Sequence, residues 1–199
     1  MEIILATHNL DKCKELKKSF SNTSIKILTL QDFPEIKEII EDGDTLEENA
    51  FIKSRTVFNI TKIPTISDDT GLEVDALNGE PGIYSARYAG SNCSYLDNVN
   101  KLLESMENID DRLRAAKFRT AVTFINKDME LVAEGSVQGT ITRKAKGNSG
   151  FGYDPIFYIP SYNKTFAEMT LDEKNNFSHR SRAIHNLQLL FKEHSLFNK

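Results

Sequence analysis

Residues 63–88, IPTISDDTGLEVDALNGEPGIYSARY, carry the most informative pattern in the chain. An apolar run, Ile63–Ile66, leads into two adjacent acidic residues, Asp68 and Asp69, which a Thr-Gly pair follows at once. This order predicts a strand that ends in a sharp turn carrying both carboxylates. Glycine and proline recur at 79–82, which predicts a second tight turn close behind the first.

The two carboxylates predict a cation site. Adjacent carboxylates repel each other unless a cation lies between or beside them, and a site made of oxygen ligands alone suits Mg²⁺ better than zinc. A polar turn is the ordinary alternative for a lone pair of aspartates. Two turns rich in Gly and Pro around this pair favour a shaped site, so we expect Asp68 and Asp69 to face a cation.

Length and composition predict one ordinary globular domain, residues 1–199, with one substantial core or a core split into two lobes. Of its 199 residues, 39% are hydrophobic and 27% are charged, which excludes a disordered chain. The net charge of −4 argues against a nucleic-acid partner bound through a broad basic face. Local clusters of Lys or Arg could still hold a small anion.

Nothing in the sequence predicts export or a membrane partner. The two cysteines, Cys13 and Cys93, form no CxxC pair and lie in no cluster with zinc spacing, so we expect free thiols. The first ten residues hold too short an apolar run for a signal peptide, and no stretch approaches the roughly 20 apolar residues of a membrane span. We therefore expect a soluble, cytoplasmic protein.

Hydrophobic periodicity predicts strands and helices along the whole chain. Strands are expected at 2–6, 25–30, 115–125 and 131–142, with a hairpin turn at 126–128. Helices are expected after residue 10 up to 20, and at 46–59, 95–106 and 181–191, and capping boxes occur at 45–48 and 170–173. Because these elements both alternate and cluster, we expect an α/β fold with a mixed sheet.

A strand, a polar turn and a helix at the N-terminus favour an anion site, since the first amides of a helix carry free N–H groups. In this turn Thr7 and Asn9 can donate hydrogen bonds, and Lys12 supplies charge. No Walker A motif is present in the sequence. A simple N-capping turn is an equally good interpretation.

The acidic segment 32–43 and the helix after it hold two further candidates. A solvated loop is the default interpretation of the segment, although one of its acids could bind a metal ion. Lys53 lies four residues after Asn49, so the two share one face of the helix. That lysine matters only if this face looks into a site.

Residues 147–155, GNSGFGYDP, place Phe151 and Tyr153 among three glycines. Exposed aromatic side chains on such a backbone would suit stacking on a nucleobase. An equally good interpretation is a glycine-rich bend with both rings in the core. Asp154 precedes a proline, which restricts its backbone and suits a fixed hydrogen bond to a base edge.

His179 and Arg180 stand at the beginning of the last predicted helix. Cations there oppose the helix dipole, which suggests that they meet an anion or another acceptor. An exposed pair of charged side chains is the plain alternative.

Five segments together resemble the inosine triphosphate pyrophosphatases, which hydrolyse non-standard purine nucleoside triphosphates. They are THNLDK (7–12), EDGDTLEENAFIK (41–53), SDDTGLEVDALNGEPGIYSARYAG (67–90), GFGYDPIF (150–157) and AEMTLDEKNNFSHR (167–180). The resemblance implies a long central mixed β-sheet with flanking helices that form two lobes around a nucleotide cleft. It also implies a homodimer, a requirement for Mg²⁺, and cleavage of ITP, dITP and XTP to the monophosphate and pyrophosphate.

The resemblance also implies roles for single residues. Glu41 and Asp69 would bind the metal, and Asp69 would accept a proton. The Thr7–Lys12 turn, together with Lys53, would hold the phosphates. The base and sugar would be lined by residues 151–154 and Lys174. The purine edge would contact His179 and Arg180. The substrate contacts are Thr7, His8, Asn9, Leu10, Asp11, Lys12, Lys53, Thr70, Phe151, Gly152, Tyr153, Asp154, Lys174, His179 and Arg180. His8 replaces the Gly of many members, which affects the shape of that turn.

Two questions stay open at this point. A carboxylate bound to Mg²⁺ is a poor base, so the proton acceptor could be the second oxygen of Asp69, Asp68, or a water bound to the metal. The substrate could also be another modified nucleotide, such as dUTP or a methylated pyrimidine triphosphate, or the chain could bind nucleotides without catalysis.

Overall fold

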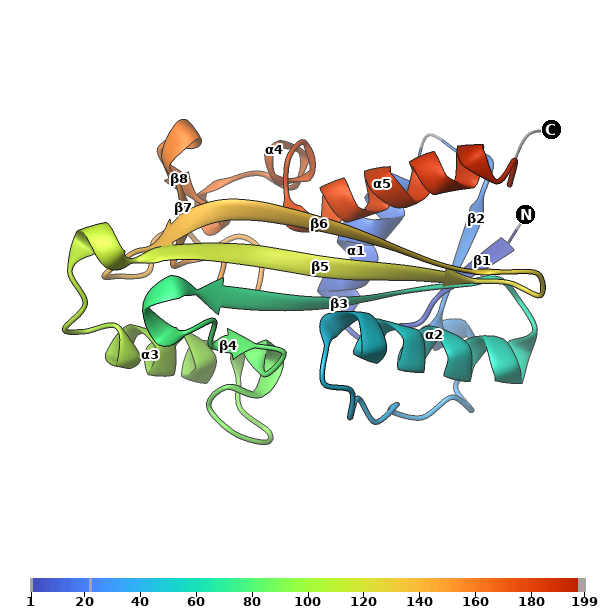
Figure 1. Ribbon diagram of the computed structural model, residues 1–199, viewed down its shortest axis with the longest axis horizontal. Coiled ribbons are helices and arrows are strands. Elements are labelled where there is room, and N and C mark those ends of the chain that lie inside the picture. Colours follow the sequence, from blue (N-terminus) through green and yellow to red (C-terminus); the bar gives the residue numbers. More distant parts are fainter. Residues whose placement is uncertain (1, 22, 197–199) are drawn as a thin grey trace. The chain divides into compact units, whose positions relative to one another are not determined.

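The computed structural model describes residues 2–21 and 23–196. Within these residues, eight strands form one sheet in the order β2-β1-β3-β5-β6-β7-β8, with β4 paired to β3 (Figure 1). The strands are β1 Glu2–Leu5, β2 Lys26–Thr29, β3 Thr65–Val74, β4 Pro81–Gly82, β5 Ala115–Ile125, β6 Glu130–Ile141, β7 Phe157–Ile159 and β8 Lys164–Thr165. The helices are α1 Leu10–Ser19, α2 Leu46–Thr61, α3 Tyr95–Ser105, α4 Leu171–Asn175 and α5 His179–Glu193.

The sheet is mixed, as predicted. Strand β1 runs parallel to both β2 and β3, whereas β4 is antiparallel to β3, and β7 is antiparallel to β6 and β8. The predicted helices and the two long strands lie within about two residues of their expected ends, which is the usual uncertainty of such boundaries. The predicted turn at 126–128 joins β5 to β6, where the Asn126 N–H donates to the Met129 carbonyl over 3.1 Å.

One prediction about the central stretch is wrong. The strand does not end before the two aspartates, because β3 continues from Thr65 to Val74 and carries Asp68 and Asp69 in its middle. Buried Arg180 and partly buried Lys12 hold the Asp68 carboxylate there, as described below. Beyond the acids, Gly71 allows β4 to approach closely, since a Cβ at this position would lie 2.8 Å from the Gly82 carbonyl oxygen.

Contacts divide the chain into two compact units, each built from separate segments. The first unit contains residues 1–69, 120–135 and 178–199. The second contains residues 70–119 and 136–177. Strands β3, β5 and β6 contribute residues to both.

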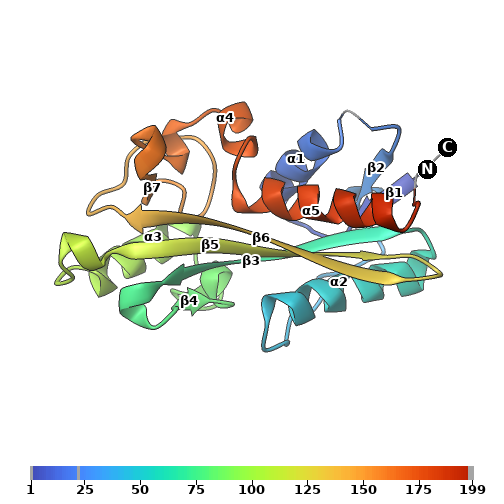
Figure 2. The same cartoon turned by 45° about the horizontal axis from the view of Figure 1, so that its top comes forward.

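The core of the first unit follows from the alternation of side chains along β1. Ile3 and Leu5 belong to a cluster with apolar residues of α1 and α5, whereas Ile4 and Ala6 pack with residues such as Val57 of α2. Helices α1 and α5 therefore cover one face of the sheet at β1, and α2 covers the other face (Figure 2). Full burial of one such aliphatic side chain contributes about 1.5–3 kcal/mol.

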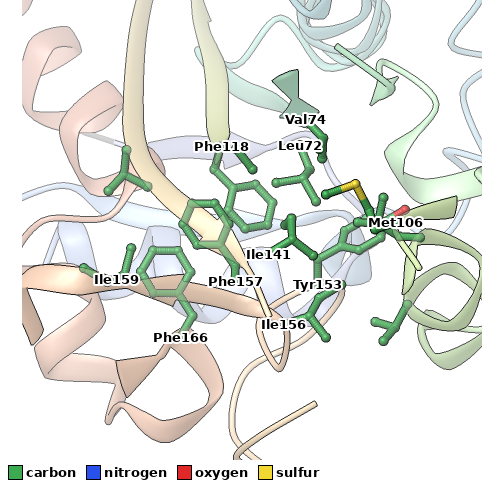
Figure 3. Close-up of a cluster of buried hydrophobic side chains, with 14 of the residues drawn as sticks. Leu72, Val74, Met106, Phe118, Ile141, Tyr153, Ile156, Phe157, Ile159 and Phe166 are labelled. Atoms are coloured by element: carbon green, nitrogen blue, oxygen red, sulfur yellow. The ribbon is translucent and has the colours of Figure 1, made fainter. Parts of the chain in front are cut away.

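The second unit has its own apolar core, in which aliphatic side chains surround a group of contacting aromatic rings (Figure 3). The ring of Phe118 lies 4.6 Å from that of Phe157, and Phe157 lies 5.2 Å from Phe166. Leu72 and Tyr153 belong to the same cluster. No helix formed by residues 2–21 and 23–196 combines the length and the apolar character needed to cross a bilayer.

Candidate active site

The turn between β1 and α1 is held by its own polar side chains. Asn9 is the N-cap of α1, and its side-chain oxygen accepts hydrogen bonds from the N–H groups of Asp11 (3.0 Å) and Lys12 (3.1 Å). The Asn9 N–H in turn donates to the Thr7 hydroxyl over 3.2 Å. The interpretation as an N-capping turn is therefore confirmed, and the cap satisfies two N–H groups of the first turn of α1.

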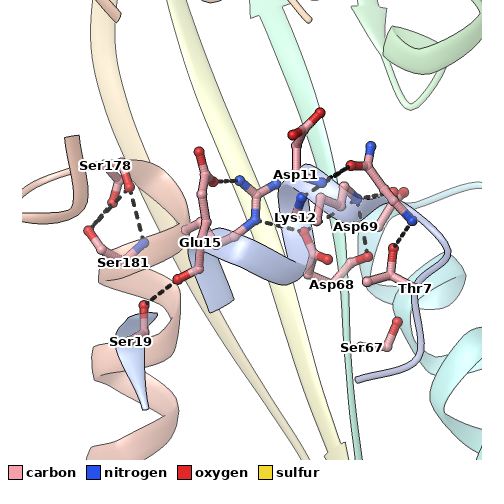
Figure 4. Close-up of polar contacts among 12 residues, drawn as sticks. Thr7, Asp11, Lys12, Glu15, Ser19, Ser67, Asp68, Asp69, Ser178 and Ser181 are labelled. Atoms are coloured by element: carbon pink, nitrogen blue, oxygen red, sulfur yellow. Dashed lines mark hydrogen bonds and ion pairs between the residues drawn. The ribbon is translucent and has the colours of Figure 1, made fainter. Parts of the chain in front are cut away.

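Lys12 extends from α1 to the two aspartates of β3. Its Nζ lies 3.3 Å from Oδ2 of Asp68 and 4.0 Å from Oδ1 of Asp69 (Figure 4). Within the first unit, a lysine ammonium group thus lies beside the two carboxylates, where a cation was predicted. One ammonium group facing two carboxylates reduces their mutual repulsion.

Asp68 is fully buried and is held by two cations. Arg180 donates from Nε to Oδ2 of Asp68 over 3.1 Å, and Lys12 contacts the same oxygen. Burial opposes the charged form of the carboxyl, but Lys12 and Arg180 outweigh it and hold the pKa of Asp68 well below its ordinary value. Asp68 is therefore ionised at neutral pH.

Arg180 also donates to the buried carboxylate of Glu15 on α1, so it joins two acids from different elements. The sequence predicted that the cations at the beginning of α5 meet an anion, and this is confirmed for Arg180. Burial alone would lower the pKa of the guanidinium, but Asp68 and Glu15 raise it above its ordinary value. Arg180 stays charged in this setting.

Gly135 of β6 allows α5 to pack where Arg180 can extend to β3. A Cβ at this glycine would lie 2.2 Å from the carbonyl oxygen of His179 and 2.3 Å from the N atom of Ala183. Both are backbone atoms of one helix turn, which cannot move aside as a flexible side chain can. No other residue type fits this contact without displacing the helix.

Asp69 faces a second lysine, which α2 supplies. The Nζ of Lys53 lies 3.6 Å from Oδ1 of Asp69 and makes a close ion pair with Glu41. Lys53 is buried and Asn49 of the same helix face is buried too, so that face does look into a polar site. Burial opposes the charge on Lys53, but Asp69 and Glu41 together raise its pKa.

The acidic loop before α2 is held against that helix. The N–H of Gly43 donates to the Asn49 side-chain oxygen over 2.9 Å, and Thr45 and Glu48 form the predicted capping box. This arrangement places Glu41, two residues earlier, within ion-pair distance of Lys53. The loop is therefore not simply solvated, because one of its acids contacts the polar cluster.

The donor set suits a hard divalent cation. Glu41 and Asp69 both contact Lys53, and their side chains are 32% and 14% exposed, so both carboxylates are accessible from solvent. Mg²⁺ is commonly bound by one or two carboxylates together with substrate phosphates and water. Among the described residues, no group of three or more His, Cys, Asp or Glu is placed to hold a metal ion, so the two carboxylates would need phosphate or water as further ligands.

The aromatic segment belongs to the second unit, where its two rings differ. Tyr153 is buried in the core, and its hydroxyl donates to the Ser85 carbonyl over 2.9 Å, so for this ring the core interpretation is correct. Burial raises the pKa of that hydroxyl. Phe151 is half-buried beside Tyr95, with ring centroids 5.8 Å apart.

Asp154 and Lys174 form a buried ion pair in the same unit. Oδ2 of Asp154 lies 2.6 Å from the Nζ of Lys174 and accepts the Phe151 N–H over 2.9 Å. The ammonium group also lies 5.1 Å from the ring centre of Phe151. The predicted hydrogen bond from Asp154 to a base edge therefore stays a prediction, while within the protein its carboxylate is held by Lys174 and by the Phe151 N–H.

The other predicted substrate contacts fall into two groups. His8 and Leu10 are exposed in the first unit, where the His8 ring lies 3.3 Å from the Lys37 carbonyl and Asp11 pairs with Lys14. Thr70 and Gly152 are partly buried in the second unit, while His179 is buried at the first turn of α5.

Glu15 is the residue of this cluster that the sequence did not single out. Its position three residues after Lys12 puts both on one face of a helix, which was the available signal. Four lysines in the same helix made an exposed charge the simpler interpretation. Glu15 is instead buried.

Comparison with known proteins finds similar chains over nearly the whole length. A dITP/XTP pyrophosphatase from Thermoanaerobacter is 43% identical over 188 residues, which are 94% of this chain and 95% of that protein. A dITP/XTP pyrophosphatase from Elusimicrobium minutum is 48% identical over 189 residues, 92% of this chain and 96% of that protein. The structure of the Staphylococcus aureus Ham1 protein superposes with a TM-score of 0.86 and 39% identity, covering 98% of this chain and all of that one.

The match to a family model agrees with these single comparisons. Residues 3–189 match the model of the Ham1 family. That range includes the β1–α1 turn, both aspartates of β3 and the beginning of α5. The chain therefore belongs to the Ham1 family.

Proposed function

We propose that this protein hydrolyses the non-standard purine nucleoside triphosphates ITP, dITP and XTP to the nucleoside monophosphate and pyrophosphate. The observation that carries the proposal is the cluster of Lys12, Lys53 and Asp69, which combines cations for a triphosphate with an accessible carboxylate. Relatives at 43–48% identity are named dITP/XTP pyrophosphatases, which supports the same substrate class here.

Asp69 is the stronger candidate for the proton acceptor. Asp68 is fully buried between Lys12 and Arg180, and its lowered pKa makes it a weak base. Asp69 lies next to it in β3 with a 14% exposed side chain, within reach of solvent. We infer that Asp69 takes the proton from the attacking water, while Asp68 orients Lys12.

In this proposal, water attacks the α-phosphorus, its proton passes to Asp69, and the bond to the leaving pyrophosphate breaks. Negative charge spreads over the phosphoryl oxygens in the transition state, so cations in fixed positions accelerate the step. Lys12 and Lys53 are held for this role by their carboxylate partners. Glu41 and one carboxylate oxygen of Asp69 would hold Mg²⁺, which when bound supplies positive charge to the phosphate oxygens. The second oxygen of Asp69 would then take the proton, since an oxygen bound to the ion is a poor base.

The Thr7–Lys12 turn is the proposed phosphate contact. Thr70, Phe151–Asp154 and Lys174 remain proposed contacts to the rest of the nucleotide, and His179 with Arg180 remain proposed readers of the purine edge. Hydrogen-bond donors aimed at the C6 oxygen would accept hypoxanthine and xanthine and reject adenine. A homodimer, a cytoplasmic location and the absence of nucleic-acid partners also remain proposals.

The test is product analysis with ITP, XTP, dUTP, ATP and GTP in the presence of Mg²⁺, with EDTA as the control. We expect ITP and XTP to give the monophosphate and pyrophosphate, with little turnover of ATP and GTP. Release of orthophosphate would indicate a phosphatase. Preferred turnover of dUTP would assign another substrate, and binding of ITP without products would indicate a non-catalytic module.

A further inference from the structure

The second unit contains a basic pocket that none of the predicted substrate residues lines. It has a volume of about 590 Å³ and lies between the end of β6, the segment after it and β7. Its cationic lining residues are Arg114, Arg143, Lys144 and Lys146. A pocket of this size is in the range that small molecules occupy.

Arg114 is the lining cation that the protein holds in a fixed position, because its residue is buried with only 3% exposure. Its guanidinium donates to four backbone carbonyls, those of Ile141 (2.7 Å), Met106 (2.5 Å), Ile109 (3.4 Å) and Thr142 (3.0 Å). Within residues 2–21 and 23–196 it forms no ion pair with a carboxylate. A buried charge that forms no ion pair is unfavourable, and the carbonyl dipoles together with the nearby Asp111 carboxylate compensate only part of it.

The remaining charges of the pocket leave it positive. Arg143 pairs with Asp111 over 2.7 Å, and Glu168, the other acid among the described residues that line the pocket, accepts the Thr165 N–H over 2.8 Å. Lys144 and Lys146 make no ion pair with any described residue. Four cations therefore face two acids in a protein whose overall charge is −4.

We propose that this pocket binds a small phosphate-type polyanion such as pyrophosphate. Lys144 and Lys146 would contact its oxygens as mobile cations, while Arg114 and Arg143 would supply a fixed positive field. A multiply charged anion matches the excess of cations better than a single carboxylate does. The proposal does not depend on the reaction proposed above.

The test is calorimetric titration of the full-length protein with pyrophosphate in EDTA, which removes metal-dependent binding elsewhere. The double variant Lys144→Gln, Lys146→Gln is compared with the double variant Lys127→Gln, Lys192→Gln, which removes the same charge at two exposed lysines of the first unit. We expect pyrophosphate to bind about tenfold or more weakly to the first variant, or 1.4 kcal/mol, and unchanged binding to the second.

Several outcomes would overturn the proposal. Equal affinity in both variants and the wild type would mean that pyrophosphate binds elsewhere, and equal weakening in both would reflect net charge alone. Sulfate that competes as well as pyrophosphate would show no preference for a polyanion. Nucleotide turnover is measured in parallel, since a loss confined to the Lys144 and Lys146 variant would assign these lysines to the reaction. Absence of turnover in the wild type would refute only the proposed reaction.

Discussion

Two groups of buried ion pairs, one in each unit, use the same chemistry in different surroundings. In the first unit the charges run from buried Arg180 and Asp68 through Lys12 to Asp69, whose side chain is 14% exposed. In the second unit, the Asp154 and Lys174 side chains are 3% and 4% exposed. The first group extends to solvent, whereas the second is covered.

This difference indicates what each group can do. A cation that contacts several carboxylates and lies near solvent can exchange one of them for a phosphate with little loss of favourable electrostatic energy. A covered pair would have to lose its mutual attraction and admit water before it met a ligand. We therefore expect a larger effect on turnover from a change at Asp69 than from one at Asp154 or Lys174, whose ion pair would have to open before either side chain contacts the nucleotide.

The largest expected effect comes from Asp69→Asn. Loss of the proton acceptor should lower kcat for ITP by about 10²–10⁴-fold, the usual contribution of general base catalysis. Nucleotide binding should largely persist, because Lys12 and Lys53 remain. Steady-state kinetics and a binding titration with ITP measure the two quantities separately.

Asp154→Asn is the matched change in the second group and should leave much more of kcat. Near-normal turnover by the Asp69→Asn variant would contradict the assignment of the base. A loss of turnover in Asp154→Asn as large as in Asp69→Asn, with the fold intact by circular dichroism, would remove the contrast between the two groups.

The next test compares the stability that the central cation of each group provides. Arg180→Met deprives two buried acids, Asp68 and Glu15, of their shared partner, whereas Lys174→Met affects the ion pair with Asp154. Breaking a buried pair costs about 3–5 kcal/mol. We expect Arg180→Met at the upper end of that range and Lys174→Met at the lower end, as measured by denaturant unfolding.

Lys127→Met, at an exposed position, is the control for loss of a lysine and should change the free energy of unfolding by less than about 0.5 kcal/mol. A larger loss of unfolding free energy for Lys174→Met than for Arg180→Met would mean that the number of carboxylates paired with a cation does not decide how much it stabilises the protein.

A smaller effect on the unfolding free energy is expected when the pH is lowered. The folded-state pKa of Asp68 lies below its unfolded value of about 3.9. Its contribution to stability is therefore complete above that value and is lost as pH falls towards the folded-state pKa. The difference in unfolding free energy between wild type and Asp68→Asn should shrink from pH 5 to pH 2.

An exposed carboxyl of the second unit provides the comparison for this titration. Hydrogen bonds from Lys164 and Thr170 lower the pKa of Glu173 to about 2. Solvent and salt screen such a site, so a Glu173→Gln profile should follow that of the wild type closely at 0.5 M salt. A difference for Asp68→Asn that stays constant with pH would contradict the proposed ionisation of Asp68.

The sequence predicted most elements because their signals are local. The capping box of Thr45 and Glu48 marked the beginning of α2, and the spacing of hydrophobic residues located α3 and β5. The turn expected at Asp68 was wrong because the partners that keep a carboxylate inside a strand are distant. Lys12 is 56 residues away in sequence and Arg180 is 112 residues away.

The same limit applied to the candidate site. Lys53 and Glu41 were predicted from a family resemblance, and their contact depends on a loop that Asn49 holds against α2. The sequence left open whether Tyr153 is exposed or buried, since a glycine-rich segment has no period that decides this. Its burial depends on the core that Leu72 and Phe157 form with it.

The smallest expected effect concerns Tyr153. Tyr153→Phe keeps the ring in the core and removes the hydrogen bond to the Ser85 carbonyl, so the unfolding free energy should fall by about 1 kcal/mol. Its kcat/KM for ITP should change by less than about twofold, since the hydroxyl is directed into the protein. A large loss of kcat/KM at unchanged stability would instead mean that this hydroxyl meets the nucleotide. The second group would then resemble the first in contacting the substrate.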